Sequence, residues 1–134
     1  MSNDDIIIQY NLDMIASARL GGSLTFSEAV ILVLQEIPYG KVCGYGHIAS
    51  LIGSPRAARQ VGFVLRGLSP KQTNPQDEHA LPWWRVIRSD GSIATKGDPM
   101  RPILQIELLK SEAIEVHEFK VSMQKYQWRT YINK

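Results

Sequence analysis

The chain has 134 residues, of which 44% are hydrophobic and 21% charged, and its formal net charge is +2. These values are typical of one folded domain and exclude a wholly disordered chain. The single cysteine, Cys43, excludes an internal disulfide and a cluster of thiolate metal ligands. No apolar run approaches the roughly 20 residues of a membrane span. We therefore expect an intracellular protein that needs no metal or cofactor and does not contact a membrane.

Basic residues gather in one part of the chain. Residues 1–36 hold one arginine and five acidic residues, whereas residues 37–72 hold five basic residues and no acidic one. A long window without a carboxylate favours a surface that binds a polyanion such as nucleic acid. On charge alone, chance clustering is the alternative.

The N-terminal part divides into two segments. Residues 1–24 are expected to form an N-terminal extension, with a short helix over about 11–19, and residues 25–134 a single domain. Thr25 and Glu28 have the spacing of a capping box and precede an apolar run. We expect this second helix to lie in the core and to end before Pro38, because the residue before a proline is disfavoured in the α region.

The next segment has the spacing of a helix-turn-helix. Residues 45–52 and 56–66 predict two short helices joined by a turn at Gly53, with Ser54 and Pro55 opening the second. One face of that helix is apolar, and the other presents Arg56, Arg59, Gln60, Phe63 and Arg66. Basic and amide groups suit contact with DNA phosphates and base edges. A solvated amphipathic helix is the alternative.

The C-terminal half predicts a loop, a hairpin and a further helix. Residues 69–80 are polar and contain two prolines, which favours a loop. Residues 81–88 and 93–95 flank a turn and predict a β-hairpin in the position of a wing. A helix over 102–109 and a strand pair within 114–121 follow. The predicted fold class is α/β, mainly helical: a single winged helix-turn-helix domain with a small β-hairpin wing.

Three segments in this order resemble the DNA-binding domain of the O6-alkylguanine-DNA alkyltransferases. They are residues 37–42 with Tyr45, residues 57–62, and Pro82-Trp83-Trp84-Arg85-Val86. The repair enzymes of that family have Pro-Cys-His-Arg-Val in the last segment, and the cysteine accepts the alkyl group. A tryptophan in its place is the mark of the alkyltransferase-like proteins, which recognise the lesion without repairing it. The resemblance covers about residues 26–128.

The resemblance implies a site for a base turned out of the duplex. Arg59 would fill the vacated stack, and Tyr45 would press the target phosphate round and bond the flipped base. Trp83 would wall the pocket, and Lys96 is the nearest basic match to an arginine that relatives carry over it. Carbonyls near Trp83 and Val86 would read the guanine amine. The predicted DNA- and lesion-binding residues are Tyr45, Arg56, Arg59, Gln60, Trp83, Arg85, Val86, Ser92 and Lys96.

The chemistry of the motif points away from alkyl transfer. That reaction needs a soft nucleophile such as a thiolate, and an indole is not one. Trp84 stands where the enzymes have a histidine, and Glu112 matches their glutamate, so only the outer member of their relay remains. We expect a structural role for Glu112, core packing for Trp84, and a small half-buried hydrophobe at Cys43.

The sequence therefore predicts a monomeric, non-enzymatic sensor of O6-alkylguanine in double-stranded DNA. By the resemblance, it would direct the lesion to nucleotide excision repair proteins. It would work with DNA, in the nucleus of a eukaryote or the cytoplasm and nucleoid of a bacterium. Two alternatives stay open: an active methylated-DNA–protein-cysteine methyltransferase, and a winged-helix transcription regulator that reads sequence.

Overall fold

The computed structural model describes residues 2–133, and helices dominate this part of the chain. The helices are α1 (Asn3–Leu20), α2 (Phe26–Glu36), α3 (Tyr45–Leu51), α4 (Ala58–Arg66), α5 (Pro70–Thr73), α6 (Met100–Ser111) and α7 (Met123–Tyr126), with a 3₁₀ turn η1 (Trp83–Arg85). Two short strands, β1 (Cys43–Gly44) and β2 (Val86–Ile87), pair in parallel. The predicted class, mainly helical with a small β element, is confirmed.

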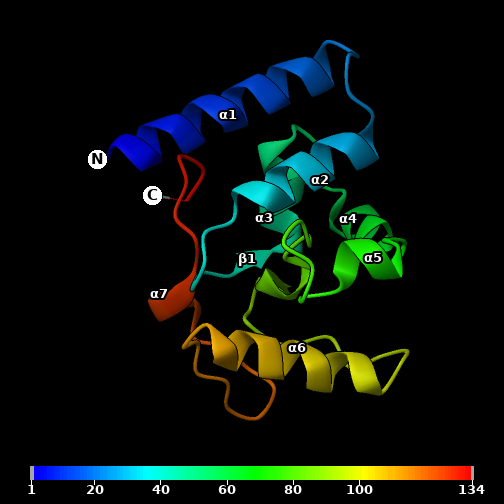
Figure 1. Ribbon diagram of the computed structural model, residues 1–134. Coiled ribbons are helices and arrows are strands. Elements are labelled where there is room, and N and C mark those ends of the chain that lie inside the picture. The colour runs from blue at the N-terminus through cyan, green and yellow to red at the C-terminus, as the bar shows by residue number, and fades with distance from the viewer. Residues whose placement is uncertain (1, 134) are drawn as a thin grey trace.

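The elements stack from one end of the molecule to the other. Figure 1 shows α1 along one end above α2, then α3 and α4, with α6 across the opposite end. Two hydrophobic clusters fill this stack. The first joins α1, α2, α3 and α4, and the second gathers Trp83, Trp84, Ile87 and Leu109 beside α6. Strand β2 ties the two clusters together, because Val86 belongs to the first cluster and its neighbour Ile87 to the second.

The helices from residue 26 to residue 66 form close to where the sequence places them. The Thr25 hydroxyl and the Glu28 carboxylate cap α2 reciprocally, and the helix ends before Pro38. Gly53 turns the chain between α3 and α4 with a φ of +80°, in the left-handed region that glycine adopts most readily. Helix α4 begins at Ala58, two residues later than predicted, because Ser54 to Ala57 form a hydrogen-bonded turn.

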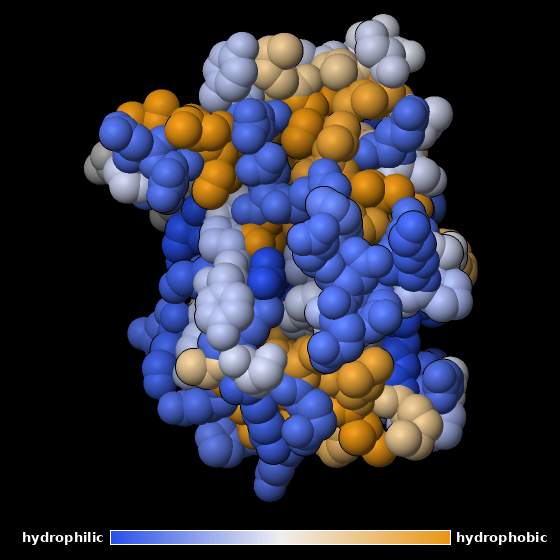
Figure 2. Space-filling view, in the orientation of Figure 1, coloured by the Kyte–Doolittle hydropathy of each residue, from blue (hydrophilic) through white to orange (hydrophobic). Residues whose placement is uncertain are grey.

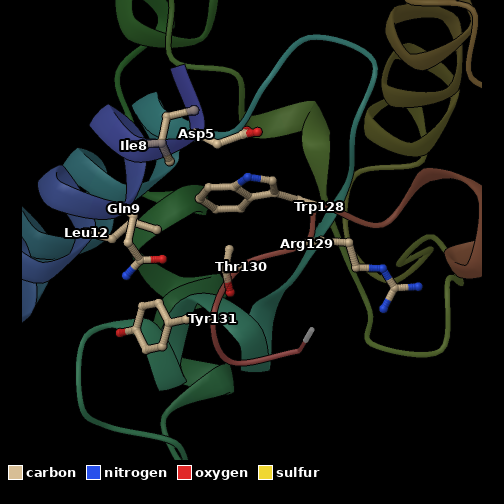
Figure 3. A pocket seen from close by; sticks show the side chains of 8 residues that line it. All are labelled: Asp5, Ile8, Gln9, Leu12, Trp128, Arg129, Thr130 and Tyr131. Atoms are coloured by element: carbon tan, nitrogen blue, oxygen red, sulfur yellow. The ribbon is translucent and has the colours of Figure 1, made fainter. Parts of the chain in front are cut away.

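Helix α1 is longer than the predicted helix over 11–19. The cause is a second capping box, in which the Ser2 hydroxyl accepts from the Asp5 N–H and the Asp5 carboxylate accepts from the Ser2 N–H. Leu12 and Ile15 are buried against the first cluster. Leu12 also lines a hollow of about 320 Å³ between α1 and residues 128–131, towards which the Trp128 ring projects (Figure 3).

The predicted β-hairpin wing takes a different form. Its turn is present, since the Arg88 N–H donates to the Ser92 carbonyl at 3.1 Å. The flanking segments, however, pair with other partners: Val86 and Ile87 with β1, and the Ile93 N–H with the Phe119 carbonyl. These three apolar residues are buried, so each lies within the core rather than on a ribbon with one solvated face.

Two further segments also differ from the prediction. The polar stretch 69–80 contains α5, which Ser69 and Gln72 cap reciprocally. The expected strand pair within 114–121 is reduced to an isolated bridge between His117 and Lys120. Both segments lie outside the helix-turn-helix.

Candidate nucleic-acid interface

Helices α3 and α4 form a helix-turn-helix that exposes one basic face. Val61 and Leu65 of α4 are buried against the first cluster, which turns the opposite side of the helix to solvent. The exposed residues of that side, with those just before the helix, are Arg56, Arg59, Gln60, Phe63 and Arg66. The Arg66 guanidinium lies 5.0 Å from the centre of the exposed Phe63 ring, so a cation and an aromatic ring lie side by side on this face.

Beside this face lies a hollow of about 440 Å³, here called the basic hollow. It is lined by Tyr45, Ala58, Arg59, Gly62, Arg66, Arg88, Ala94 and Lys96. The small residues among them leave the space, and the four cations surround it without a carboxylate in the lining. A hollow of this volume falls within the range of small-molecule sites. Its charge suits a polyanion.

Tyr45 is the first residue of α3 and borders the basic hollow. Burial raises the pKa of its phenol, while the charges of Arg101, Arg66 and Arg88 act in the opposite direction. The hydroxyl is therefore protonated at neutral pH and can donate a hydrogen bond into the hollow.

Trp83 lies elsewhere, in a fixed position that is only 3% exposed. Its indole N–H donates to the Thr73 carbonyl at 3.1 Å, and its ring meets that of Trp84 edge-on. Trp83 borders a second hollow of about 450 Å³, here called the apolar hollow, lined by Thr73, Trp83, Asp98, Met100, Arg101, Ile103, Leu104 and Glu107. The Arg101 guanidinium carbon stands 4.2 Å from the centre of the Trp83 ring.

Arg85, one of the predicted binding residues, is held by contacts within the protein and does not line the basic hollow. Its guanidinium pairs with Glu112 at 2.9 Å and donates to the Ile37 carbonyl at 2.8 Å. Glu112 also accepts from the Trp84 indole N–H at 2.7 Å. The structure therefore gives Arg85, Trp84 and Glu112 a common structural role.

Val86 and Ser92 also lie outside the basic hollow. The Val86 carbonyl accepts from the Gln105 amide at 2.9 Å, which leaves one of its two lone pairs for another donor. The Ser92 hydroxyl donates to the Asp90 carboxylate at 2.7 Å within the turn. The basic hollow thus brings together three of the predicted residues: Tyr45, Arg59 and Lys96.

The single thiol lies inside the core. Cys43 is fully buried on β1, and burial raises the pKa of its thiol far above the ordinary value. A thiol without access to solvent and without a base beside it has the properties of a structural cysteine rather than a nucleophile.

Sequence reasoning missed Arg88 and Arg101, and it did not select Arg66. Arg88 lay inside a predicted strand, and Arg101 lay one residue before the predicted start of α6. The Asp98 carboxylate accepts a hydrogen bond from the Met100 N–H, as a capping residue does at the start of a helix. A predicted helix that began one turn earlier, at Asp98, would have included Arg101. Over residues 2–133, the structure contains no group of three metal-ligating side chains and no helix long and apolar enough to cross a membrane.

Comparison with known proteins shows similarity over most of the chain. Residues 25–114 match the family described as the DNA-binding domain of 6-O-methylguanine DNA methyltransferase. The chain is 39% identical to a DNA base-flipping protein of Vibrio parahaemolyticus, over 78% of this chain and 96% of the relative. It is 37% identical to alkyltransferase-like protein 1 of Schizosaccharomyces pombe, over 78% of this chain and 94% of the relative.

Solved structures show the same similarity. The crystal structure of S. pombe Atl1 in complex with damaged DNA containing O6-carboxymethylguanine matches with a TM-score of 0.64 and 32% identity, over 88% of this chain and 97% of that one. A second complex, of S. pombe ATL with DNA, matches with a TM-score of 0.68 and 33% identity, over 78% of this chain and 95% of that one.

Proposed function

Because this chain belongs to the family of 6-O-methylguanine DNA methyltransferase DNA-binding domains, we propose that it is a non-enzymatic sensor of O6-alkylguanine in double-stranded DNA. The observation that carries the proposal is the pairing of two features. The helix-turn-helix borders a hollow surrounded by four cations, and by the family resemblance Trp83 stands where the enzymes have a reactive cysteine. The chain is similar to proteins described as base-flipping and as bound to alkylated DNA.

The exposed face of α4 suits the binding and opening of a duplex. Arg56, Gln60 and Arg66 would contact phosphates and groove edges, while Arg59 would stack in the gap left by the extruded base. The extruded base would enter the basic hollow beside Tyr45, whose protonated hydroxyl would donate to it. Lys96, which also lines the hollow, would hold the flanking phosphate.

A buried thiol supports the non-enzymatic part of the proposal. In the enzymes the alkyl group passes to a cysteine, whereas the one thiol of this chain lies in the core. Mass spectrometry after incubation with a duplex containing O6-methylguanine is expected to show unmodified protein. An added mass of about 14 Da, the replacement of one hydrogen by a methyl group, would instead establish the transferase alternative.

Binding without transfer would make the protein a marker of damage. We propose that one protein molecule binds one lesion and that nucleotide excision repair proteins then recognise the complex, in the compartment that holds the DNA. A sedimentation experiment on the protein with a lesion duplex tests the stoichiometry. Excision of the lesion by a reconstituted nucleotide excision system, with and without this protein, tests the handover.

A binding titration tests lesion recognition directly. At one stated salt concentration, duplexes that differ only by one O6-methyl group should differ clearly in affinity for the protein. Equal affinity for both, with discrimination among undamaged sequences, would support the transcription-regulator alternative instead.

Arg59→Ala sharpens the titration. The substitution should weaken lesion binding by about 1–3 kcal/mol, the size of one stacking contact. Lys110→Ala is the matched control, because this substitution also removes one positive charge, but at the far end of α6. Trp83→Ala should cost more binding energy as the alkyl group becomes larger, because the apolar contact with the ring grows.

A further inference from the structure

The Arg101 side chain occupies an unusual place for a cation. It is half-buried in the first turn of α6, with its guanidinium 4.2 Å above the centre of the Trp83 ring. Over residues 2–133, no hydrogen bond or ion pair of the guanidinium accompanies this ring contact. The acidic group whose charge acts on the guanidinium is Asp98. One oxygen of the Asp98 carboxylate already accepts a hydrogen bond from the Met100 N–H. All five donors of the guanidinium are thus left for another partner.

Arg101 also stands between the two hollows. It lines the apolar hollow with Trp83, while its charge acts on Tyr45 and Arg66, which line the basic hollow. Burial and the charge of Arg66 lower the pKa of the Arg101 guanidinium. A cation that is partly desolvated and close to a second cation is poised to bind an anion.

We infer that Arg101 selects lesions by the charge of the O6 substituent, favouring adducts that end in a carboxylate over neutral adducts of similar size. This inference rests on the proposed function, in which the adduct reaches the face of Trp83. Any group that does so must meet the guanidinium that covers that face. A carboxylate can accept two parallel N–H bonds from it, whereas a neutral alkyl chain only displaces it from the ring.

Lys96 is the competing candidate for this role. Lys96 is exposed and lines the basic hollow, and the family resemblance makes it the cation over the pocket. It does not border the apolar hollow, and an ammonium lacks the planar fork that matches a carboxylate. The geometry therefore points to Arg101 as the selecting residue.

The test compares two lesions in one duplex at fixed salt: O6-carboxymethylguanine and the neutral, similarly sized O6-propylguanine. The measured quantity is the ratio of their dissociation constants, with the undamaged duplex as reference. Wild-type protein should bind the carboxymethyl lesion more tightly. Arg101→Met should reduce that preference roughly tenfold, the factor carried by one charge-assisted hydrogen bond of ordinary strength. Arg101→Lys should keep part of the preference.

Two further variants show whether the effect is specific. Lys110→Met removes a charge from the distant end of α6, and its ratio should equal that of wild type. Lys96→Met should weaken the binding of both lesion duplexes by the same factor, because it changes only the overall electrostatic potential of the basic hollow. Thermal unfolding of each variant establishes that it is folded at the temperature of the titration.

The outcomes separate the inference from the function on which it rests. An unchanged ratio in Arg101→Met, or an equal change in Lys96→Met, overturns the role of Arg101 while lesion binding stands. Failure of wild-type protein to bind either lesion better than the undamaged duplex overturns the proposed function and this inference with it.

Discussion

Glu112 shows how one buried carboxylate can fix the geometry of the whole motif. Its oxygens accept from the Gly40 N–H at 2.8 Å, from the Trp84 indole N–H at 2.7 Å, and from Arg85. These donors come from the loop before β1 and from the 3₁₀ turn that carries Trp83. By the family resemblance, Glu112 matches the outer member of the enzymes' relay and Trp84 stands in the place of the histidine. Because the Trp84 indole N–H donates to Glu112, we expect the carboxylate to stabilise the fold.

Glu112→Gln should therefore destabilise the fold more than an ordinary surface change. The substitution leaves the Arg85 guanidinium, whose side chain is 14% exposed, without its counter-charge. Loss of one partner of such a buried pair costs about 3 kcal/mol in the free energy of unfolding, measured by urea denaturation. Glu115→Gln is the matched control, because the Glu115–Lys125 pair is more than half exposed and should cost at most about 1 kcal/mol. Similar costs for the two variants would contradict a structural role for Glu112.

Cys43 links the stability of the fold to pH. Because burial raises the pKa of its thiol, the folded state keeps the proton while the unfolded chain loses it above about pH 8.5. The stabilisation is complete below that pH and is lost as the pH rises further. The free energy of unfolding should then fall between pH 8.5 and pH 10 by up to ~1.4 kcal/mol per pH unit.

Cys43→Ala should remove most of that slope, whatever its effect on stability at neutral pH. Urea denaturation at several pH values up to pH 10 gives the slope for both proteins. The raised pKa values of Tyr45 and Tyr131 add to the slope only near pH 10, where tyrosines of the unfolded chain begin to ionise, and they do so in both proteins. An equal slope in both proteins would mean that the thiol is accessible to solvent.

At the scale of elements, local signals in the sequence predicted local structure well. The capping box at Thr25, the glycine between α3 and α4, and the proline after α2 each act on their immediate neighbours. The sequence also indicated that Tyr45, Arg59 and Lys96 belong to one site, although only through family resemblance. The start of α1 was missed because the capping box at Ser2 was not recognised.

Pairing between distant segments was not predictable in the same way. The run from Val86 to Ile93 has the alternation of a hairpin, yet β2 pairs with β1, about 40 residues earlier in the chain. The partner of a short apolar strand is determined by burial, that is, by which of its edges and faces the rest of the chain covers. The stacking of Arg101 on Trp83 has the same origin, because it depends on where α6 crosses the 3₁₀ turn.

A substitution at Gly91 tests whether the turn within residues 86–93 packs against residues 119–121. Its φ is +91°, and a Cβ at this position would meet the Val121 carbonyl oxygen, which is backbone and cannot give way easily. Gly91→Ala should therefore destabilise the protein by several kcal/mol in thermal or urea unfolding. Gly22→Ala is the control, since Gly22 has a φ of +84° but open space around it, and should cost about 1 kcal/mol. A free hairpin at 86–93, unpacked from residues 119–121, would make the two costs equal.

At the scale of the whole molecule, apolar and polar surfaces separate along the stack of helices. Figure 2 shows hydrophobic side chains gathered at the end formed by α1 and again over α6, with hydrophilic side chains between them. Exposed apolar residues include Ile6, Ile7, Tyr10, Met14 and Leu20 on α1, and Met100, Ile103 and Leu104 on α6. Helix α1 also carries three aspartates, and no residue of α1 lines the basic hollow beside α4. This arrangement keeps most of the acidic charge of residues 1–36 off the surface that would bind DNA.

Residues 1–24 lie outside the family match, yet α1 contributes to the first hydrophobic cluster. Leu12→Ala should therefore cost about 2–5 kcal/mol in the free energy of unfolding, because its side chain is 1% exposed and its removal leaves a cavity. Met14→Ala, on the same helix but 54% exposed, should cost less than about 0.5 kcal/mol. Since neither residue contacts the basic hollow, both variants should keep the wild-type ratio of affinities for lesion and undamaged duplexes while they are folded. Equal stability of the two variants would show that α1 is a separate appendage, whereas a changed affinity ratio in Leu12→Ala would show that α1 also supports the DNA-binding surface.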